Sequence, residues 1–172
     1  MQHLSGIGAS KGIALEPIIR IQPKLAAIAP TKAQDPDAER ARFLQAVSES
    51  CEALQALFVS ASKTDAEAAA IFEVHQMMLD DPDLTEGVEA LLAEGWTAQW
   101  AVHQTAEQLK NQLLACSDPY FQARAADVED ISRRVIRQLM QETDDSSAIL
   151  SRGIVVADDL LPSQTVQFDR EK

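Results

Sequence analysis

The stretch IVVADDLLPSQT (154–165) decides the fold class, because it places a strand after a long helical block. Ile154 to Ala157 is a short apolar run rich in β-branched residues, which is typical of a buried strand. A polar turn with a Pro, a Ser and a Thr follows it. The sequence on the other side of the helical block must then show whether this strand has a partner.

Residues 35–142 favour helices joined by short turns. Each expected helix has a start signal, either a capping residue or a proline that is tolerated only in the first turn. These signals are Asp35-Pro36, Thr64 with Glu67, Asp81-Pro82, Thr97 and Ser117 to Pro119. Gly95 is well placed to end the third helix. Short turns between helices predict antiparallel neighbours, and therefore a bundle.

Apolar residues recur at steps of three and four along the first and last helices, so that each buries one face. The expected buried face of the first helix is Phe43, Val47, Cys51, Leu54, Phe58 and Ala61. On the last helix it is Phe121, Val128, Ile131, Val135 and Leu139.

A second strand candidate precedes the helices at Ile13 to Ile21, with Pro17 tolerated only at an edge or bulge. The order strand, helices, strand predicts a mostly α, α+β fold in which a helical-bundle subdomain is inserted into an α/β domain. The expected division is 1–30 in the α/β domain, 31–145 in the helical subdomain, and 146–172 back in the α/β domain, which is expected to be incomplete.

The chain carries a formal net charge of -12, which disfavours nucleic acid and anionic membranes and suits a basic or neutral protein partner. Acidity also serves solubility alone, so it does not decide between partners. Neither a signal peptide nor an apolar run long enough to span a membrane is visible. Cys51 and Cys116 are therefore expected to be reduced thiols of a cytoplasmic protein.

Neither the glycine-rich stretch near the N-terminus nor the histidines predict a nucleotide or metal site. GIGASKG (6–12) has the spacing G-x-G-x-x-x-G and lacks G-K-[ST], so a tight bend is favoured over a nucleotide site. The three histidines, His3, His75 and His103, show no convincing ligand spacing, and no metal site is predicted. His75 is expected to be a hydrogen-bonded histidine inside the bundle.

An acidic helix break, LDDPDL (79–84), is flanked by Met77 and Met78 and ends in Leu84. Methionine adapts well to protein-docking surfaces, so the break could receive an apolar patch rimmed by Lys or Arg. Equally, one methionine could pack inward while the aspartates only cap the next helix. Spacing alone leaves both interpretations open.

Four segments together resemble one family: GIGASKGIA (6–14), AIFEVHQMMLDDPDL (70–84), RAADVEDISRRVIRQL (124–139) and VVADDLLPSQT (155–165). In this order and spacing they are similar to the N-terminal domain of enzyme I, the phosphoenolpyruvate-protein phosphotransferase of the bacterial sugar phosphotransferase system. The resemblance covers nearly the whole chain. It implies a phosphohistidine α/β domain with an inserted helical subdomain that docks the phosphocarrier protein HPr.

The resemblance also implies which residues meet HPr, and that Asp127 helps to orient Arg124. The implied docking residues are Glu67, Met77, Met78, Leu84, Leu114, Arg124 and Asp127. Such enzymes take phosphate from phosphoenolpyruvate onto a histidine and pass it to HPr during sugar uptake. No cofactor is expected in this chain.

The family's reactive histidine lies in a G-G-x-T-S-H segment beyond LLPSQT, so the chain is expected to end before it and to be inactive alone. Thr165 would then orient that absent imidazole. Mg²⁺ binding and homodimerisation are expected of a C-terminal domain outside this sequence. Lys11 and Leu161 replace the Pro and Thr usual in the family, which leaves open the enzyme I portion of a fused multiphosphoryl transfer protein.

Two alternatives remain. A helical protein-binding adaptor without phosphotransfer chemistry explains the helices and the acidity, but makes the flanking strands and LLPSQT incidental. The swivelling phosphohistidine domain of a pyruvate phosphate dikinase or phosphoenolpyruvate synthase relative shares the chemistry, but lacks the docking insertion.

Overall fold

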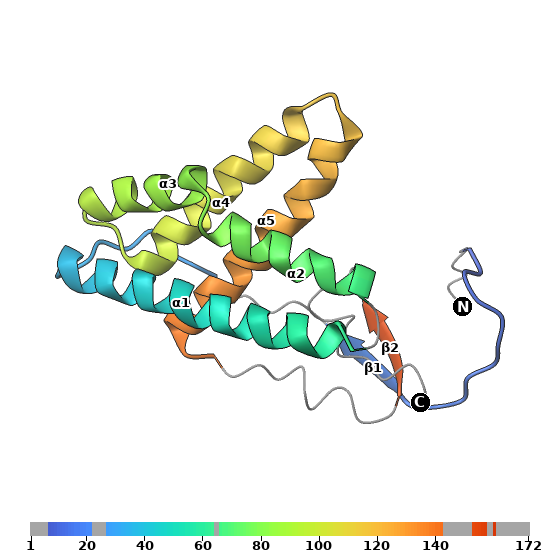
Figure 1. Cartoon of the computed structure of the whole chain (residues 1–172). Coiled ribbons are helices and arrows are strands. Elements are labelled where there is room, and N and C mark those ends of the chain that lie inside the picture. The colour runs from blue at the N-terminus through green and yellow to red at the C-terminus, as the bar shows by residue number, and fades with distance from the viewer. Residues whose placement is uncertain (1–6, 22–26, 64–65, 143–152, 158–159, 161–172) are drawn as a thin grey trace, which may run out of the picture.

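The structure, a computed structural model, describes residues 7–21, 27–63, 66–142, 153–157 and 160. Within these ranges the chain forms a strand, five helices and a second strand (Figure 1). The elements are β1 (Ile18–Ile21), α1 (Pro36–Ala61), α2 (Ala66–Leu79), α3 (Pro82–Ala93), α4 (Ala98–Ala115), α5 (Pro119–Met140) and β2 (Ile154–Ala157). This order confirms the predicted mostly helical fold, in which helices separate two strands.

Three of the helices begin at an Asp-Pro pair, as predicted. The Asp35 carboxylate accepts hydrogen bonds from two backbone N–H groups of the first turn of α1, both at 3.1 Å. Asp81 and Asp118 each accept one such bond, at 2.9 Å, at the starts of α3 and α5. The proline that follows has no backbone N–H that would need a partner in the first turn. Each Asp-Pro pair therefore favours the start of a helix. Thr64, from the capping box predicted for α2, lies outside the described residues.

The start of α4 differs from the prediction. Thr97 occupies the cap position, but its side chain makes no capping hydrogen bond. Instead Glu39, on α1, accepts a hydrogen bond from the Ala98 N–H at 2.7 Å. A carboxylate at a helix N-terminus is favoured by the helix dipole as well as by the bond itself. The cap of α4 is therefore supplied by a residue distant in sequence.

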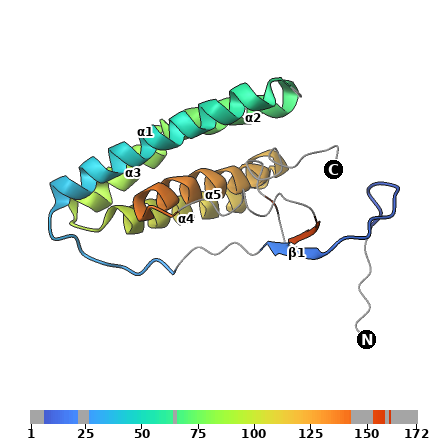
Figure 2. The same ribbon diagram turned by 90° about the horizontal axis from the view of Figure 1, so that it is seen from below.

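The helices pack as two antiparallel pairs, α1 with α2 and α4 with α5, and α3 packs on α4 and α1 at one end (Figure 2). Every helix contributes fully buried side chains to the core between the pairs, including Phe43, Leu54, Phe72, Val88, Val102 and Val135. Burying one such side chain stabilises the fold by about 1.5–3 kcal/mol. Among the described helices, none has the combination of length and apolar character needed to cross a membrane.

The two strands form a small parallel sheet, with Ile18 opposite Ile154 and Ile21 opposite Ala157. Parallel strands require a crossover connection, and here the whole helical block forms it. β1 is shorter than the predicted span of Ile13 to Ile21. Ile13 lies outside the strand and is 102% exposed. The pairing begins at Pro17, whose carbonyl accepts a hydrogen bond from the Ile154 N–H at 2.8 Å. Within the described residues the ladder starts directly after this proline, which has no N–H to donate.

Candidate partner-binding groove

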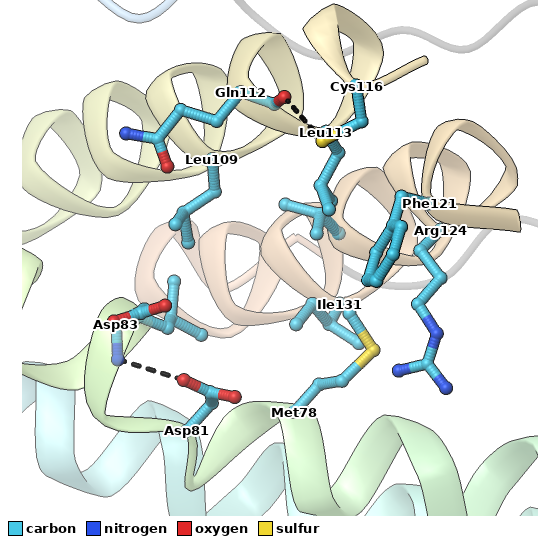
Figure 3. A pocket seen from close by; sticks show the side chains of 12 residues that line it. Met78, Asp81, Asp83, Leu109, Gln112, Leu113, Cys116, Phe121, Arg124 and Ile131 are labelled. Atoms are coloured by element: carbon cyan, nitrogen blue, oxygen red, sulfur yellow. Dashed lines mark hydrogen bonds between the residues drawn. The ribbon is translucent and has the colours of Figure 1, made fainter. Parts of the chain in front are cut away.

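An open groove of about 410 Å³ lies where four helix ends meet (Figure 3). One wall is the end of α2 with the start of α3, and the other is the second half of α4 with the first half of α5. The apolar side chains that line it are Met78, Leu84, Leu109, Leu113, Phe121, Val128 and Ile131. Polar lining comes from Asp81, Asp83, Gln112, Cys116 and Arg124. The groove is therefore apolar in its centre and charged at its edges.

The acidic edge follows from the break between α2 and α3. The chain turns at Asp81, whose N–H donates to the Met78 carbonyl at 3.3 Å. The Asp81 carboxylate caps α3, and it lies beside exposed Asp83. Two carboxylates at the first turn of a helix suit its dipole, so the fold itself stabilises this charge.

The opposite wall is held by the turn between α4 and α5. Cys116 is central to this turn: its N–H donates to the Leu113 carbonyl at 3.2 Å, and its carbonyl accepts from the Gln122 side chain at 2.8 Å. Its thiol is also bound, to the Gln112 carbonyl at 3.4 Å. The turn places Leu113 and Phe121 on the same wall of the groove.

Phe121 corrects one prediction. Sequence periodicity placed it on the buried face of the last helix, but it is 45% exposed and lines the groove. The other predicted positions of that face, Val128, Ile131, Val135 and Leu139, are buried. Phe121 sits in the first turn of α5, where the helical pairs diverge around the groove (Figure 1), so its apolar ring has no core to enter.

Three of the predicted docking residues line the groove: Met78, Leu84 and Arg124. Leu84 is only 3% exposed and belongs to the floor, whereas Met77 and Leu114 are 66% and 51% exposed on the surrounding surface. At the acidic break Met78 is half-buried and Met77 is exposed, so one methionine packs inward while the other stays on the surface. Glu67 lies in the first turn of α2.

The Asp127 carboxylate contacts the His75 ring and not Arg124, which it was expected to orient. His75 is fully buried, and its Nε2 is 3.4 Å from Asp127 Oδ1, which joins α2 to α5. Its Nδ1 has no hydrogen-bond partner among the described residues. This confirms the prediction of a hydrogen-bonded histidine within the bundle. Arg124 instead donates from Nη2 to the Tyr120 hydroxyl at 2.8 Å.

Several residues that line the groove were not predicted from the sequence as docking residues: Leu109, Gln112, Leu113, Cys116 and Phe121. Leu109, Leu113 and Cys116 share a helical face at steps of four and three, a signal that sequence alone could have used. Tyr120 and Arg124 are likewise one turn apart. In the ranges that the structure describes, no group of three or more His, Cys, Asp or Glu is placed to hold a metal ion. Thr165 and Leu161 lie outside those ranges.

Comparison with known proteins places this geometry in a family. Residues 5–124 match the family model described as "PEP-utilising enzyme, N-terminal". The phosphoenolpyruvate-protein phosphotransferase of Bacillus subtilis is 34% identical over 174 residues, covering 99% of this chain and 30% of that protein. The phosphoryl donor subunit DhaM of a PEP-dependent dihydroxyacetone kinase from Klebsiella michiganensis is 35% identical over 136 residues, covering 78% of this chain and 29% of that protein.

Solved structures agree. A solution structure of an enzyme I protein superposes with a TM-score of 0.73 at 31% identity, covering 86% of this chain and 62% of that chain. The chain spans about three tenths of the length of the curated relatives that it matches.

Proposed function

The chain belongs to the family of N-terminal domains of PEP-utilising enzymes, and from that premise we propose that it is the partner-docking part of a phosphoenolpyruvate-protein phosphotransferase. In this proposal the parent enzyme relays phosphate from phosphoenolpyruvate, through a histidine, to HPr during sugar uptake. The helical block supplies the surface on which HPr, or an HPr-like domain, docks.

The observation that carries the proposal is the groove. Phe121 lines it and is 45% exposed, and two further exposed apolar residues, Met77 and Leu114, each follow or precede a lining residue in the sequence. Apolar surface that stays exposed around a concavity, with polar groups at its edge, is typical of a protein-docking site. The groove residues include three of those that the family resemblance implies, namely Met78, Leu84 and Arg124.

Charge supports a partner with a basic face. The chain has a formal net charge of -12, and two carboxylates, Asp81 and Asp83, stand at one edge of the groove. Complementary charge speeds the encounter of two proteins and sets their orientation. A partner with an apolar ridge flanked by Lys or Arg would fit this edge.

The two histidines within the described ranges, His75 and His103, make poor phosphate acceptors. His75 is fully buried, and His103 is half-buried against Trp100, with ring centroids 5.8 Å apart. Phosphoryl transfer needs a nucleophile in line with the phosphorus, which a buried imidazole cannot offer to a second protein. We therefore propose that the chain alone transfers no phosphate, and that a histidine elsewhere in the parent, oriented by Thr165, does so.

Mg²⁺ binding, homodimerisation through the remainder of the parent and action in the cytoplasm belong to the same proposal.

The proposed domain division remains 1–30, 31–145 and 146–172. The pairing of β1 with β2 supports it, because two strands on either side of the helical block meet in one sheet. In this arrangement the docking unit and the phosphohistidine unit are covalently joined through both strands. Such a connection would bring two imidazoles from two proteins within reach of each other.

The test is a titration of ¹⁵N-labelled HPr from the same genome with the 172-residue chain, followed by heteronuclear NMR. Saturable shifts on one face of HPr are expected. In the reverse titration, the labelled chain should show its largest shifts at the groove, with small shifts around Lys32 and Trp96 at the opposite end of α4. An HPr spectrum unchanged at high concentrations of the chain would refute docking.

A helical adaptor without phosphotransfer chemistry is the alternative. The two ideas differ in the full-length parent, which should gain an acid-labile phosphate from phosphoenolpyruvate and pass it to HPr, while the 172-residue chain should gain none. Failure of the parent to take up phosphate would favour the adaptor. The match to a phosphoryl donor subunit covers only 29% of that subunit, which supports a parent longer than this chain.

A further inference from the structure

We infer that Tyr120 is a positioning residue of the groove, because it holds the Arg124 guanidinium ready to bind an oxygen acceptor on the docked partner. This inference rests on the proposed function. It assigns the orientation of Arg124 to a tyrosine outside the set of docking residues that the family resemblance implies.

Two contacts join the residues. Arg124 Nη2 donates to the Tyr120 hydroxyl at 2.8 Å, and the guanidinium carbon lies 5.2 Å from the centroid of the Tyr120 ring. The residues are one helical turn apart on α5, the spacing at which side chains on a helix surface meet. A hydrogen bond combined with a cation–π contact fixes both the place and the tilt of a planar guanidinium.

Tyr120 is itself held in place. Its N–H donates to the capping carboxylate of Asp118 at 2.9 Å, and its ring lies edge-on to that of Phe121, with centroids 5.7 Å apart. Phe121 in turn lines the groove. The tyrosine is thus anchored to the start of the helix and to the groove wall, although 60% of it is exposed.

The contact leaves the positive charge of Arg124 intact. A phenol orients a guanidinium without neutralising it, whereas a carboxylate would cancel its charge. Asp127, the expected orienting group, faces His75 instead. Among the ion pairs of the described residues none involves Arg124. A guanidinium has five N–H donors, so several remain for a partner after one binds Tyr120.

The two edges of the groove carry opposite charges. Arg124 stands at the α5 edge and the carboxylates of Asp81 and Asp83 stand at the α3 edge, with apolar side chains between them (Figure 3). A partner that places an acceptor oxygen at Arg124 and a basic group at the carboxylates fits in one orientation, and the reverse orientation brings like charges together. Orientation matters for the proposed relay, since it decides whether the two imidazoles meet.

A double-mutant cycle tests the inference. Affinity for HPr is measured by calorimetry for the 172-residue chain and for Tyr120→Phe, Arg124→Gln and the double variant. Tyr120→Phe keeps the ring and removes only the hydroxyl. We expect it to weaken binding about threefold, within the range found for single polar contacts at an interface rim. In the double variant, removing the hydroxyl should cost nothing further, because its effect acts through Arg124. Arg133→Gln is the control, because it removes the same charge from a position on α5 that does not line the groove. It should bind HPr as tightly as the unaltered 172-residue chain does.

A second readout needs no partner. Tyr120 is the sole tyrosine, so 3-fluorotyrosine labelling gives a single ¹⁹F signal. Arg124→Gln should shift that signal and Arg133→Gln should leave it in place. An unmoved signal in Arg124→Gln would overturn the inference, as would binding losses that simply add in the double variant, or full affinity in Tyr120→Phe. Failure of the unaltered chain to bind HPr at all would instead remove the proposed function, and the inference with it.

Discussion

The side chain of Glu39 on α1 supplies the N-terminal cap of α4, because its Oε2 accepts a hydrogen bond from the Ala98 N–H at 2.7 Å. The same carboxylate binds Arg42 through Oε1 at 2.6 Å, and Arg42 donates to the Leu139 carbonyl at 2.9 Å. One cluster of side chains thus joins α1 to the start of α4 and to the end of α5. It holds the two helical pairs together at the end opposite the groove.

Replacing Glu39 with Ala should therefore weaken the whole bundle. Loss of a capping side chain typically costs about 0.5–2 kcal/mol, and we expect the upper half of that range because Arg42 also loses its partner. Urea denaturation followed by tryptophan fluorescence measures the free energy of unfolding, since Trp96 and Trp100 flank the start of α4. Glu52→Ala removes an equal charge from an exposed position on α1, and an equal loss in that control would contradict the prediction.

Gly87 on α3 lies directly against Thr105 on α4. A Cβ at this position would lie 2.7 Å from Thr105 Cγ2, so Gly87→Ala should destabilise the fold by roughly 1–3 kcal/mol. In a Thr105→Ala background the obstructing methyl is gone. There the same change should stabilise by roughly 0.5–1 kcal/mol, because Ala is a better helix former than Gly. Thermal unfolding of the four proteins measures both values, and a loss of equal size in both backgrounds would refute the steric explanation.

Gly153 should be required for the strand pair but not for the helices. A Cβ there would lie 2.6 Å from Ile19 Cδ1 and 2.8 Å from the Pro17 carbonyl oxygen. Gly153→Ala should therefore speed hydrogen exchange of the Ile154 amide, which is bound to that same carbonyl, while helical circular dichroism stays unchanged. Gly95→Ala, at a glycine with φ of 81° and open space around it, is the control, and should leave the exchange of Ile154 alone.

Cys51 should react slowly with thiol reagents. Burial raises the pKa of its thiol, and the nearby Asp80 carboxylate raises that pKa further. A higher pKa leaves less thiolate at a given pH, so alkylation should be slow near neutral pH and accelerate as the pH rises. The Cys116→Ser variant isolates the Cys51 signal, and its rate in the native state is compared with the rate in guanidinium. Asp80→Asn should speed the native reaction, and identical native and unfolded rates at every pH would exclude any protection.

Two exposed leucines test the docking surface directly. Leu114 is 51% exposed near the groove, and Leu44 is 53% exposed on α1 away from it. Leu114→Asp should weaken HPr binding about tenfold or more, because it places a charge within an apolar contact. Leu44→Asp adds the same charge at equal exposure and should leave the affinity unchanged within about twofold. A similar loss in both variants would mean that general acidity, and not the groove, governs affinity.

The parts of the fold that sequence predicted are those governed by local chemistry. An Asp followed by Pro favours a helix start through local bonds alone, which is why the beginnings of α1 and α3 were predicted to the residue and that of α5 within Ser117 to Pro119. The strand Ile154–Ala157 was also predicted correctly, since its β-branched run has no competing helical pattern.

The parts that failed depend on contacts between distant segments. The cap of α4 comes from Glu39, on another helix, and nothing near Ala98 announces it. Phe121 obeys the helical period of α5, yet it is exposed because the bundle opens into the groove at that turn. Tyr120 and Arg124 were within reach of local rules, but i,i+4 spacing alone does not distinguish a solvated pair from a functional one.

The sheet register has a consequence for how such enzymes could change partners. Ile18 pairs with Ile154 and Ile21 with Ala157, so β1 before the helical block and β2 after it form one sheet of four residue pairs. A chimaera that keeps this ladder and takes its helices from a relative with a different carrier would preserve both splice points. Under the function proposed above, partner choice and phosphate chemistry could then diverge separately, because the helical block joins the sheet through β1 and β2.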